Sequence, residues 1–483
     1  MKVWIAAPAA WLLFAAPGWA QDHQHDHAAP AQQEQPAQAE HNHSQHQHDA
    51  PAPAAAAEHD HSQHQHDAPA AAAPEHDHSQ MAPPEDSAAD MHAMMMASMR
   101  GTYGPYAMGR DASGTAWQPD VSSHGGLHRH VGDWMVMGHV MLNGVYAWSD
   151  GPRGDEKAFV AGMVMGSARR DIGERGTLNF RAMMSPDPFM GANGYPLLMA
   201  AGESADGVEP LVDRQHPHDL FMELSASYAH RIGENSSVFI YGGLPGEPAF
   251  GPPAFMHRMS AMDSPEAPLT HHWFDSTHIT FGVLTAGVTH GDWKFEGSRF
   301  RGREPDQDRY DIETGELDSN ALRVSWNPTA NLSFQASWAD ITSPEALEPD
   351  EDEERWSVSG IYTRPLADGG WWSTTVAFAN KERSDGVSLD AWLVEAAWHP
   401  NENWTVFGRG EAIETDELGL AHHGPVEDVA RLSAGVIHDW RINESAVFGV
   451  GALVQQHFAS DALEPLYDGD PQGAMAFVRL KIG

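Results

Sequence analysis

The chain has 483 residues, no cysteine and a formal net charge of −40, from 28 basic and 68 acidic side chains. So large an acidic surplus argues against nucleic acid as a partner, because it repels a phosphate backbone. Without cysteine there are no disulfides or thiolate ligands, so any bound metal must be held by His, Met, Asp or Glu.

Residues 1–20 have the features of a secretory signal peptide. Lys2 is followed by an apolar run from Val3 to Ala16, which is too short to cross a bilayer as a helix, and a small-residue cleavage site ends at Ala20. We expect the mature chain to begin at Gln21. No later run of 18 apolar residues occurs, so no transmembrane helix is expected.

Residues 21–90 repeat one histidine phrase three times, starting at Glu40, Glu58 and Glu75. The segment has no lysine or arginine and too few apolar residues to bury, so we expect a disordered tail. Paired imidazoles in such a tract are typical of metal binding, although a solubilising spacer is an alternative. The predicted ligands are His41, His43, His46, His48, His59, His61, His64, His66, His76 and His78.

Residues 91–130 are interpreted as a methionine-rich linker or plug. Thioether sulfur is a soft ligand suited to Cu(I), so histidine followed by methionine points to copper, with zinc or nickel as alternatives. The methionines could instead provide adaptable apolar surface. The predicted sulfur ligands are Met81, Met91, Met94, Met95, Met96 and Met99.

Residues 131–483 alternate apolar with small or polar residues, as at Trp392, Val394, Ala396 and Trp398. A period of two predicts strands with two unlike faces. The all-β fold expected is a transmembrane antiparallel β-barrel of about sixteen strands. These are predicted at 131–149, 156–168, 174–184, 219–232, 235–243, 276–289, 291–300, 318–327, 331–341, 354–363, 371–380, 388–399, 403–413, 428–441, 444–455 and 472–482.

The predicted connections alternate in length, as periplasmic turns and extracellular loops do in outer-membrane barrels. An even strand count then places the N-terminal tail in the periplasm of a Gram-negative bacterium, and the barrel in contact with lipid and lipopolysaccharide. Tryptophans near both strand ends, such as Trp398 and Trp356, favour this over a soluble β-sandwich. The last strand ends Leu-Lys-Ile-Gly, without the terminal aromatic residue of many such barrels.

Two long loops carry further candidate ligands. His216 and His218 lie in the first, and the second holds Met256, His257, His271 and His272. A metal site inside the barrel mouth is one hypothesis, and loop histidines bonded to their neighbours are the other.

Four phrases suggest a family: D-R-Q-H-P-H-D-L-F-M-E-L from Asp213, Y-G-G-L-P-G-E-P-A-F-G-P-P-A-F-M-H-R from Tyr241, H-H-W-F-D-S-T-H-I-T-F-G from His271 and F-R-G-R-E-P-D-Q-D-R-Y-D-I-E-T-G from Phe300. The chain resembles an uncharacterised family of proteobacterial outer-membrane β-barrels associated with copper and heavy-metal resistance clusters. Its layout also resembles that of copper-resistance protein B, in architecture alone. These resemblances imply metal handling at the outer membrane and supply no catalytic residue.

The sequence therefore favours a non-enzymatic, metal-handling barrel whose tail captures or buffers copper. Periplasmic metal-efflux or metal-oxidase components are conceivable partners. Two alternatives remain open: a general porin with a metal-buffering tail, and a barrel enzyme acting on lipid or envelope polymer. The familiar nucleophile, phosphate-loop and zinc-protease motifs do not occur in the sequence.

Overall fold

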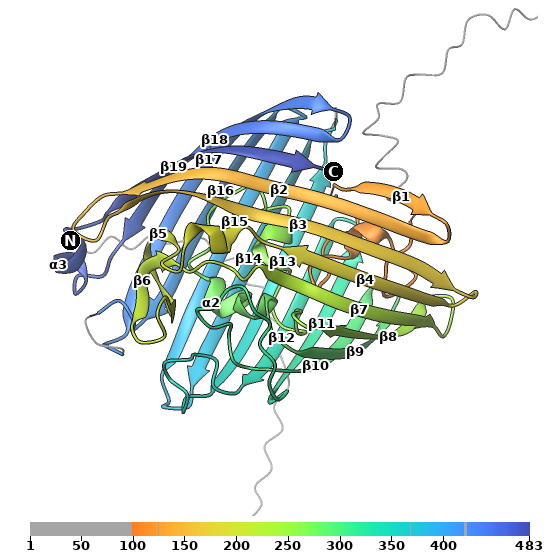
Figure 1. Ribbon diagram of the computed structural model, residues 1–483, viewed down its shortest axis with the longest axis horizontal. Helices are drawn as coiled ribbons and strands as arrows, with labels where there is room; N and C mark the ends of the chain where they lie inside the picture. Colours follow the sequence, from red (N-terminus) through yellow and green to blue (C-terminus); the bar gives the residue numbers. More distant parts are fainter. Residues whose placement is uncertain (1–98, 124, 368, 420–422) are drawn as a thin grey trace, which may run out of the picture. The chain divides into compact units, whose positions relative to one another are not determined.

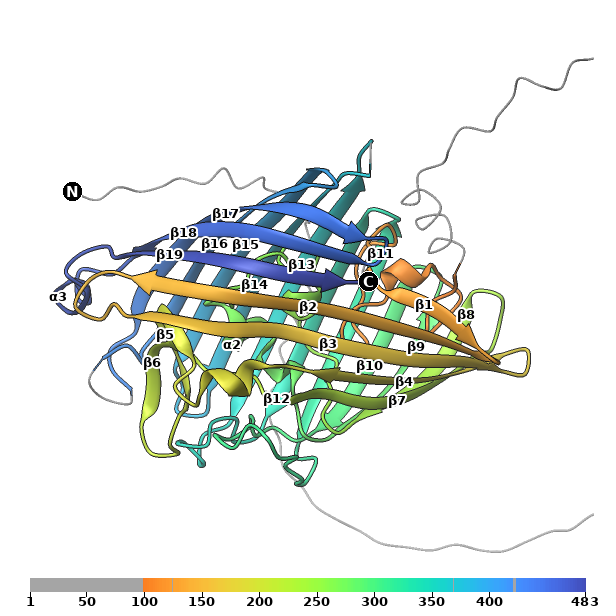
Figure 2. The same ribbon diagram turned by 45° about the horizontal axis from the view of Figure 1, so that its top comes forward.

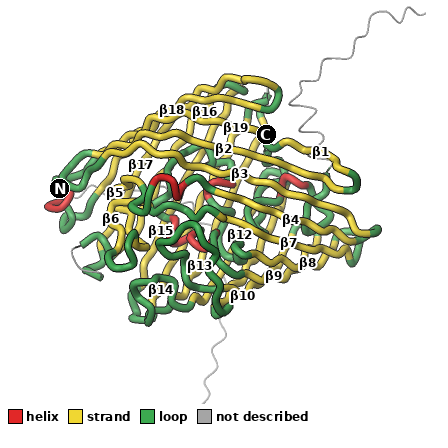
Figure 3. The backbone as a smooth tube through the Cα atoms, in the orientation of Figure 1, coloured by secondary structure: helices red, strands yellow, loops and turns green. Residues whose placement is uncertain are grey.

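A computed structural model describes residues 99–123, 125–367, 369–419 and 423–483. The chain divides into two compact units, Met1–Gln80 and Met81–Gly483, and every described residue belongs to the second. Strands and loops make up most of this part, and its helices are short turns (Figure 3). None of the described helices is long and apolar enough to cross a membrane.

Sixteen antiparallel strands form a closed barrel, which confirms the predicted fold (Figure 1). Each strand pairs with the next along the chain, except where β4 pairs with β7, and β19 pairs with β2 to close the ring. The strands are β2 (Trp134–Ser149), β3 (Glu156–Ile172), β4 (Gly176–Met184), β7 (Phe221–Arg231), β8 (Ser236–Gly243), β9 (Val283–His290), β10 (Trp293–Phe300), β11 (Ser319–Thr329), β12 (Leu332–Ile341), β13 (Glu353–Pro365), β14 (Trp371–Arg383), β15 (Ser388–Asn401), β16 (Trp404–Thr415), β17 (Glu427–Asn443), β18 (Ala446–Phe458) and β19 (Gln472–Ile482).

Three short strands lie outside this ring and were not predicted. β1 (Leu127–Val131) pairs with the start of β2, on the same edge of β2 that pairs with β19 further along the strand. β5 (Tyr195–Ser204) and β6 (Pro210–Gln215) form a hairpin within the loop between β4 and β7. The strand predicted from residue 276 begins only at Val283, because the residues before it fold into the barrel interior.

The two ends of the barrel differ. At one end, the short-turn end, neighbouring strands are joined by turns such as 232–235, 291–292 and 444–445. At the other, the long-loop end, the connections include 185–220 and 244–282. β2 begins and β19 ends at the short-turn end.

The barrel wall is apolar outside and polar inside. Trp392, Val394 and Trp398 of β15 are 56%, 53% and 49% exposed on the outer face, while Glu395 between them is buried. A wide apolar exterior of this kind marks a surface that contacts lipid rather than water. Exposed tryptophans lie near the short-turn end and near the long-loop end; they include Trp293, Trp326, Trp398, Trp404 and Trp440 at the former and Trp148 and Trp356 at the latter.

Residues 244–282, here called the inner loop, lie inside the barrel. In both ribbon views its helix α2 (His271–Phe274) lies between the front strands β2–β4 and the back strands β13–β15 (Figures 1 and 2). The fully buried Arg258 fixes the loop to the wall, because its Nε lies 2.6 Å from Oε1 of Glu395. Thr270 likewise donates from its backbone N–H to Glu411 of β16 at 3.1 Å.

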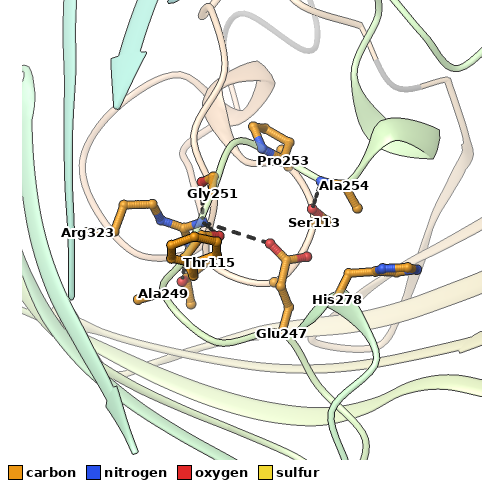
Figure 4. Close-up of polar contacts among 12 residues, drawn as sticks. Ser113, Thr115, Glu247, Ala249, Gly251, Pro253, Ala254, His278 and Arg323 are labelled. Atoms are coloured by element: carbon orange, nitrogen blue, oxygen red, sulfur yellow. Dashed lines mark hydrogen bonds and ion pairs between the residues drawn. The ribbon is translucent and has the colours of Figure 1, made fainter. Parts of the chain in front are cut away.

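Residues 99–123, the N-terminal segment, also enter the interior. Arg323 of β11 joins this segment to the inner loop, because it donates to Thr115 Oγ1 and to the carbonyl oxygen of Gly251, each at 3.0 Å (Figure 4). Nearby, Ala254 donates from its N–H to Ser113 Oγ at 2.8 Å. Two separate segments, the inner loop and the N-terminal segment, therefore occupy the barrel interior.

Candidate metal centre

Five buried histidines lie together inside the barrel. His216 and His218 follow β6, His271 and His272 begin α2, and His278 ends the 3-10 turn η4 (Ser276–His278). Their ring centroids are 5.1 Å apart for His218 and His278, 5.2 Å for His271 and His278, and 5.4 Å for His271 and His272. His216 lies 5.7 Å from His272 and 6.1 Å from His271.

Three of these rings are held through Nδ1. His218 donates to Asp187 Oδ2 at 2.8 Å, and His271 donates to Asp275 Oδ1 at 2.7 Å. His278 donates to the backbone carbonyl oxygen of Asp275 at 2.6 Å. Because these partners only accept, the neutral form of each ring has its proton on Nδ1 and its lone pair on Nε2. Metal-binding histidines are oriented in the same manner by outer-shell carboxylates and carbonyls.

The other two rings face carboxylates at longer range. His216 Nδ1 lies 3.2 Å from Glu203 and His272 Nδ1 lies 3.8 Å from Glu304. Gly202 has a φ of +120°, and a Cβ at this position would meet His272 Cε1 at 2.8 Å. The backbone of β5 therefore comes close to the ring only because this residue is glycine.

The Nε2 atoms of His216, His218 and His278 are buried and find no hydrogen-bond partner among the described residues. Leaving a buried polar atom unsatisfied costs about 1–3 kcal/mol, so three in one cluster call for an explanation. Burial holds the pKa of His216, of His272 and of His278 well below the usual range, and neighbouring positive charges act in the same direction. The neutral imidazole that results is the form that binds metal.

The donor set fits a borderline transition metal such as Cu(II), Zn(II) or Ni(II), all of which accept imidazole nitrogen. The cluster is more open than a closed coordination sphere. In the described part of the chain, three ligand atoms within 4.8 Å of one another occur at Glu348, Glu351 and His423 and at Asp306, Asp311 and Glu313, both in loops between strands, and not among the five histidines. A metal ion would have to draw the five rings closer together.

The structure brings together four loop histidines that the sequence singled out, His216, His218, His271 and His272. Met256 lies beside them and lines a cavity of about 50 Å³ together with His218. His257 lines a different cavity, of about 80 Å³. The tail ligands from His41 to Met96 lie outside the described residues, and Met99 is half-buried at the start of the described chain.

The sequence prediction omitted His278, Asp187 and Asp275 from the site. The spacing H-H-x-x-D-x-x-H from His271 does carry a signal, because it places an acid and a third imidazole within eight residues. Asp187 could not have been found in this way, because it precedes its partner His218 by 31 residues.

The fold and the interior define a class: a closed sixteen-stranded antiparallel barrel with an apolar outer face, an occupied lumen and a buried histidine cluster. No protein-family model and no curated protein matches the sequence. Among solved structures, the chain is similar to the anion-selective porin from Comamonas acidovorans, with 10% identity, a TM-score of 0.43, and coverage of 72% of this chain and 100% of the porin. It is also similar to OmpF of Salmonella typhi in complex with daunomycin, with 11% identity, a TM-score of 0.46, and coverage of 74% and 100%. The function is therefore argued from this chain's own residues.

Proposed function

We propose that this protein is an outer-membrane β-barrel that binds a transition-metal ion, copper in the first place, at the five-histidine cluster inside its lumen. The single observation that carries the proposal is the group of three buried imidazole nitrogens without hydrogen-bond partners in the described chain, at His216, His218 and His278. A bound cation would satisfy all three.

The membrane location is supported by the apolar exterior and by the alternation of short turns and long loops. By the same rule the short-turn end faces the periplasm, which would place the histidine-rich tail there. The tail would capture or buffer the ion, and the barrel would anchor the tail or pass the ion outward.

The occupied interior favours this function over a general porin. The inner loop crosses the lumen and is tied to β15 through Arg258, and the N-terminal segment is tied to β11 through Arg323. A pore open to any small solute would have to run past both.

The test is Cu(II) binding to the full chain in detergent, followed by electron paramagnetic resonance. All proteins compared would carry asparagine at the fourteen histidines from His23 to His92, so that the signal comes from the barrel. We expect nitrogen hyperfine structure from one Cu(II) per barrel, and its loss in the double variant His218→Asn/His278→Asn. The exposed His290 supplies the control variant, His290→Asn, which should bind normally. Undiminished Cu(II) binding in the double variant would reject the site. Solute flux through the parent protein that does not depend on metal would favour the general porin as the function.

A further inference from the structure

Methionines gather on one arc of the inner barrel wall. Met141 of β2, Met163 of β3, Met183 of β4 and Met222 of β7 are 5%, 3%, 4% and 0% exposed, and they pack into one cluster with Ile279 and Phe281. The half-buried Met165, Met256 and Met262 pack against the same cluster.

The strand register places these side chains directly beside one another. Met141 is paired with Met163 across β2 and β3, and Met165 is paired with Met183 across β3 and β4. Directly opposite residues in an antiparallel pair have Cβ atoms about 4.5–5.5 Å apart, so two thioethers of a pair can reach one ion.

Most of the remaining wall does not share this composition, although β19 carries one buried methionine, Met475. Among the strands that the structure describes, β8 to β18 carry no methionine. Their buried apolar positions carry residues such as Leu393, Phe407, Ile437 and Leu453 instead. Packing against the inner loop is thus achieved elsewhere without sulfur, so packing alone does not account for the methionine arc.

The arc reaches from the histidine cluster toward the N-terminal segment. The cavity of about 50 Å³ is lined by Met141, Met163, Met256 and Met262 together with His218. The cavity of about 80 Å³ is lined by Met108 of the N-terminal segment, Met137 and Met165. Met165 packs against the cluster and also lines the second cavity, so methionines of β2 and β3 line both cavities.

We propose that this methionine arc is a binding site for a soft monovalent metal ion, Cu(I), with Met141, Met163 and Met256, which line the same cavity as His218, as sulfur ligands. Thioether sulfur prefers soft ions, and it needs no deprotonation to bind. A single positive charge is also less costly to bury than a double one. Binding here does not depend on the proposed function; only a transfer of the ion between the arc and the histidine cluster would rest on it.

The test is Cu(I) binding to the full chain under reducing conditions, in competition with a Cu(I)-selective chelator. The parent would carry leucine at the six predicted tail sulfur ligands, so that tail sulfur does not contribute; these are Met81, Met91, Met94, Met95, Met96 and Met99. We expect Met141→Leu/Met163→Leu/Met256→Leu to weaken binding at least tenfold and to remove Cu–S scattering from the X-ray absorption spectrum. Leucine roughly conserves volume, so heat-modifiable gel mobility should be kept. The control is Met184→Leu, because Met184 is 39% exposed on the outer face.

Unchanged Cu(I) affinity in the folded triple variant would overturn the inference and leave the arc as packing. If the triple variant fails to fold, Ag(I) can be titrated into the parent protein, in which the tail methionines are leucine, labelled at its methionine methyl carbons. Shifts confined to resonances assigned to the arc would support the site, and no shift there would reject it. Loss of Cu(II) binding in His218→Asn/His278→Asn with Cu(I) binding retained would separate this site from the histidine cluster.

Discussion

Arg258 and Asp275 form a buried ion pair within the inner loop, with Nη1 2.8 Å from Oδ2. The other oxygen of the same carboxylate accepts from His271 Nδ1 at 2.7 Å. One acid therefore connects the residue that fixes the loop to the wall with one ring of the candidate metal centre. Orientation of the ligands and attachment of the loop are coupled through it.

Asp275→Asn should damage both properties. It removes the negative charge that faces Arg258, and it leaves one acceptor oxygen where two had served Arg258 and His271. Breaking one partner of a buried pair costs about 3–5 kcal/mol, and loss of an outer-shell partner lowers metal affinity about 10–100-fold. Copper titration and heat-modifiable mobility would measure the two effects. Asp133→Asn is the matched control, because Asp133 is 74% exposed in a surface pair with Arg170; equal losses in both variants would contradict the role of Asp275.

Gly202→Ala should weaken metal binding without touching a ligand. The added Cβ would lie 2.8 Å from His272 Cε1, and the φ of +120° is strained for alanine. We expect the ring of His272 to be displaced and copper affinity to fall, while the barrel wall stays folded. Gly386→Ala controls for the strain alone, because Gly386 also has a positive φ, of +90°, and has open space around its Cβ position. Normal binding in Gly202→Ala would argue that His272 is not a ligand.

Acidification should loosen the metal-free inner loop. The pKa of His216, of His272 and of His278 is lowered in the folded protein, mainly by burial, so below about pH 6.5 the unfolded rings bind more protons. Their contribution to stability is therefore present above that pH and is lost as pH falls toward the folded pKa values. Glu203 acts in the opposite direction, because burial raises its pKa to about 8.

Hydrogen exchange of residues 268–280 at pH 7.5 and pH 5 would measure this effect. The control is the triple variant with asparagine at the three histidines, since the difference between the two proteins isolates their contribution from that of Glu203. With the slower intrinsic exchange at pH 5 taken into account, lower protection factors at pH 5 are expected in the wild type, and a smaller change in the variant. An equal pH response in both would contradict the assignment.

Alternation alone located all sixteen barrel strands, because each strand has one apolar and one polar face, as in β15 with Trp392 outside and Glu395 inside. It failed where alternation continued into the inner loop. The residues from Ser276 to Gly282 alternate like a strand, but His278 and Thr280 bond within the loop instead of to a neighbouring strand.

The site was only partly predictable. The histidine-rich loops indicated His216 and His271 as candidate ligands. No spacing along the chain predicts that the two loops meet inside the barrel. The methionine arc was missed for a different reason. The inward parity of Met141 and Met163 can be read from the period of two, but their pairing depends on strand register, which turn and loop lengths alone did not supply.

Releasing the N-terminal segment should open the lumen. Arg323 is buried and donates to Thr115 of that segment and to the backbone of the inner loop, while Glu296 accepts from it at 2.9 Å. Arg323→Met keeps much of the side-chain length and removes every one of these donors, and Lys294 then remains as the basic partner of Glu296. We expect larger single-channel conductance in planar bilayers than for the wild type, whose lumen is filled. Arg441→Met is the control, because Arg441 is 52% exposed at the short-turn end. A wild-type conductance already as large as that of the Arg323 variant would mean that solutes pass the two segments freely, and the porin would then be the better account of the barrel.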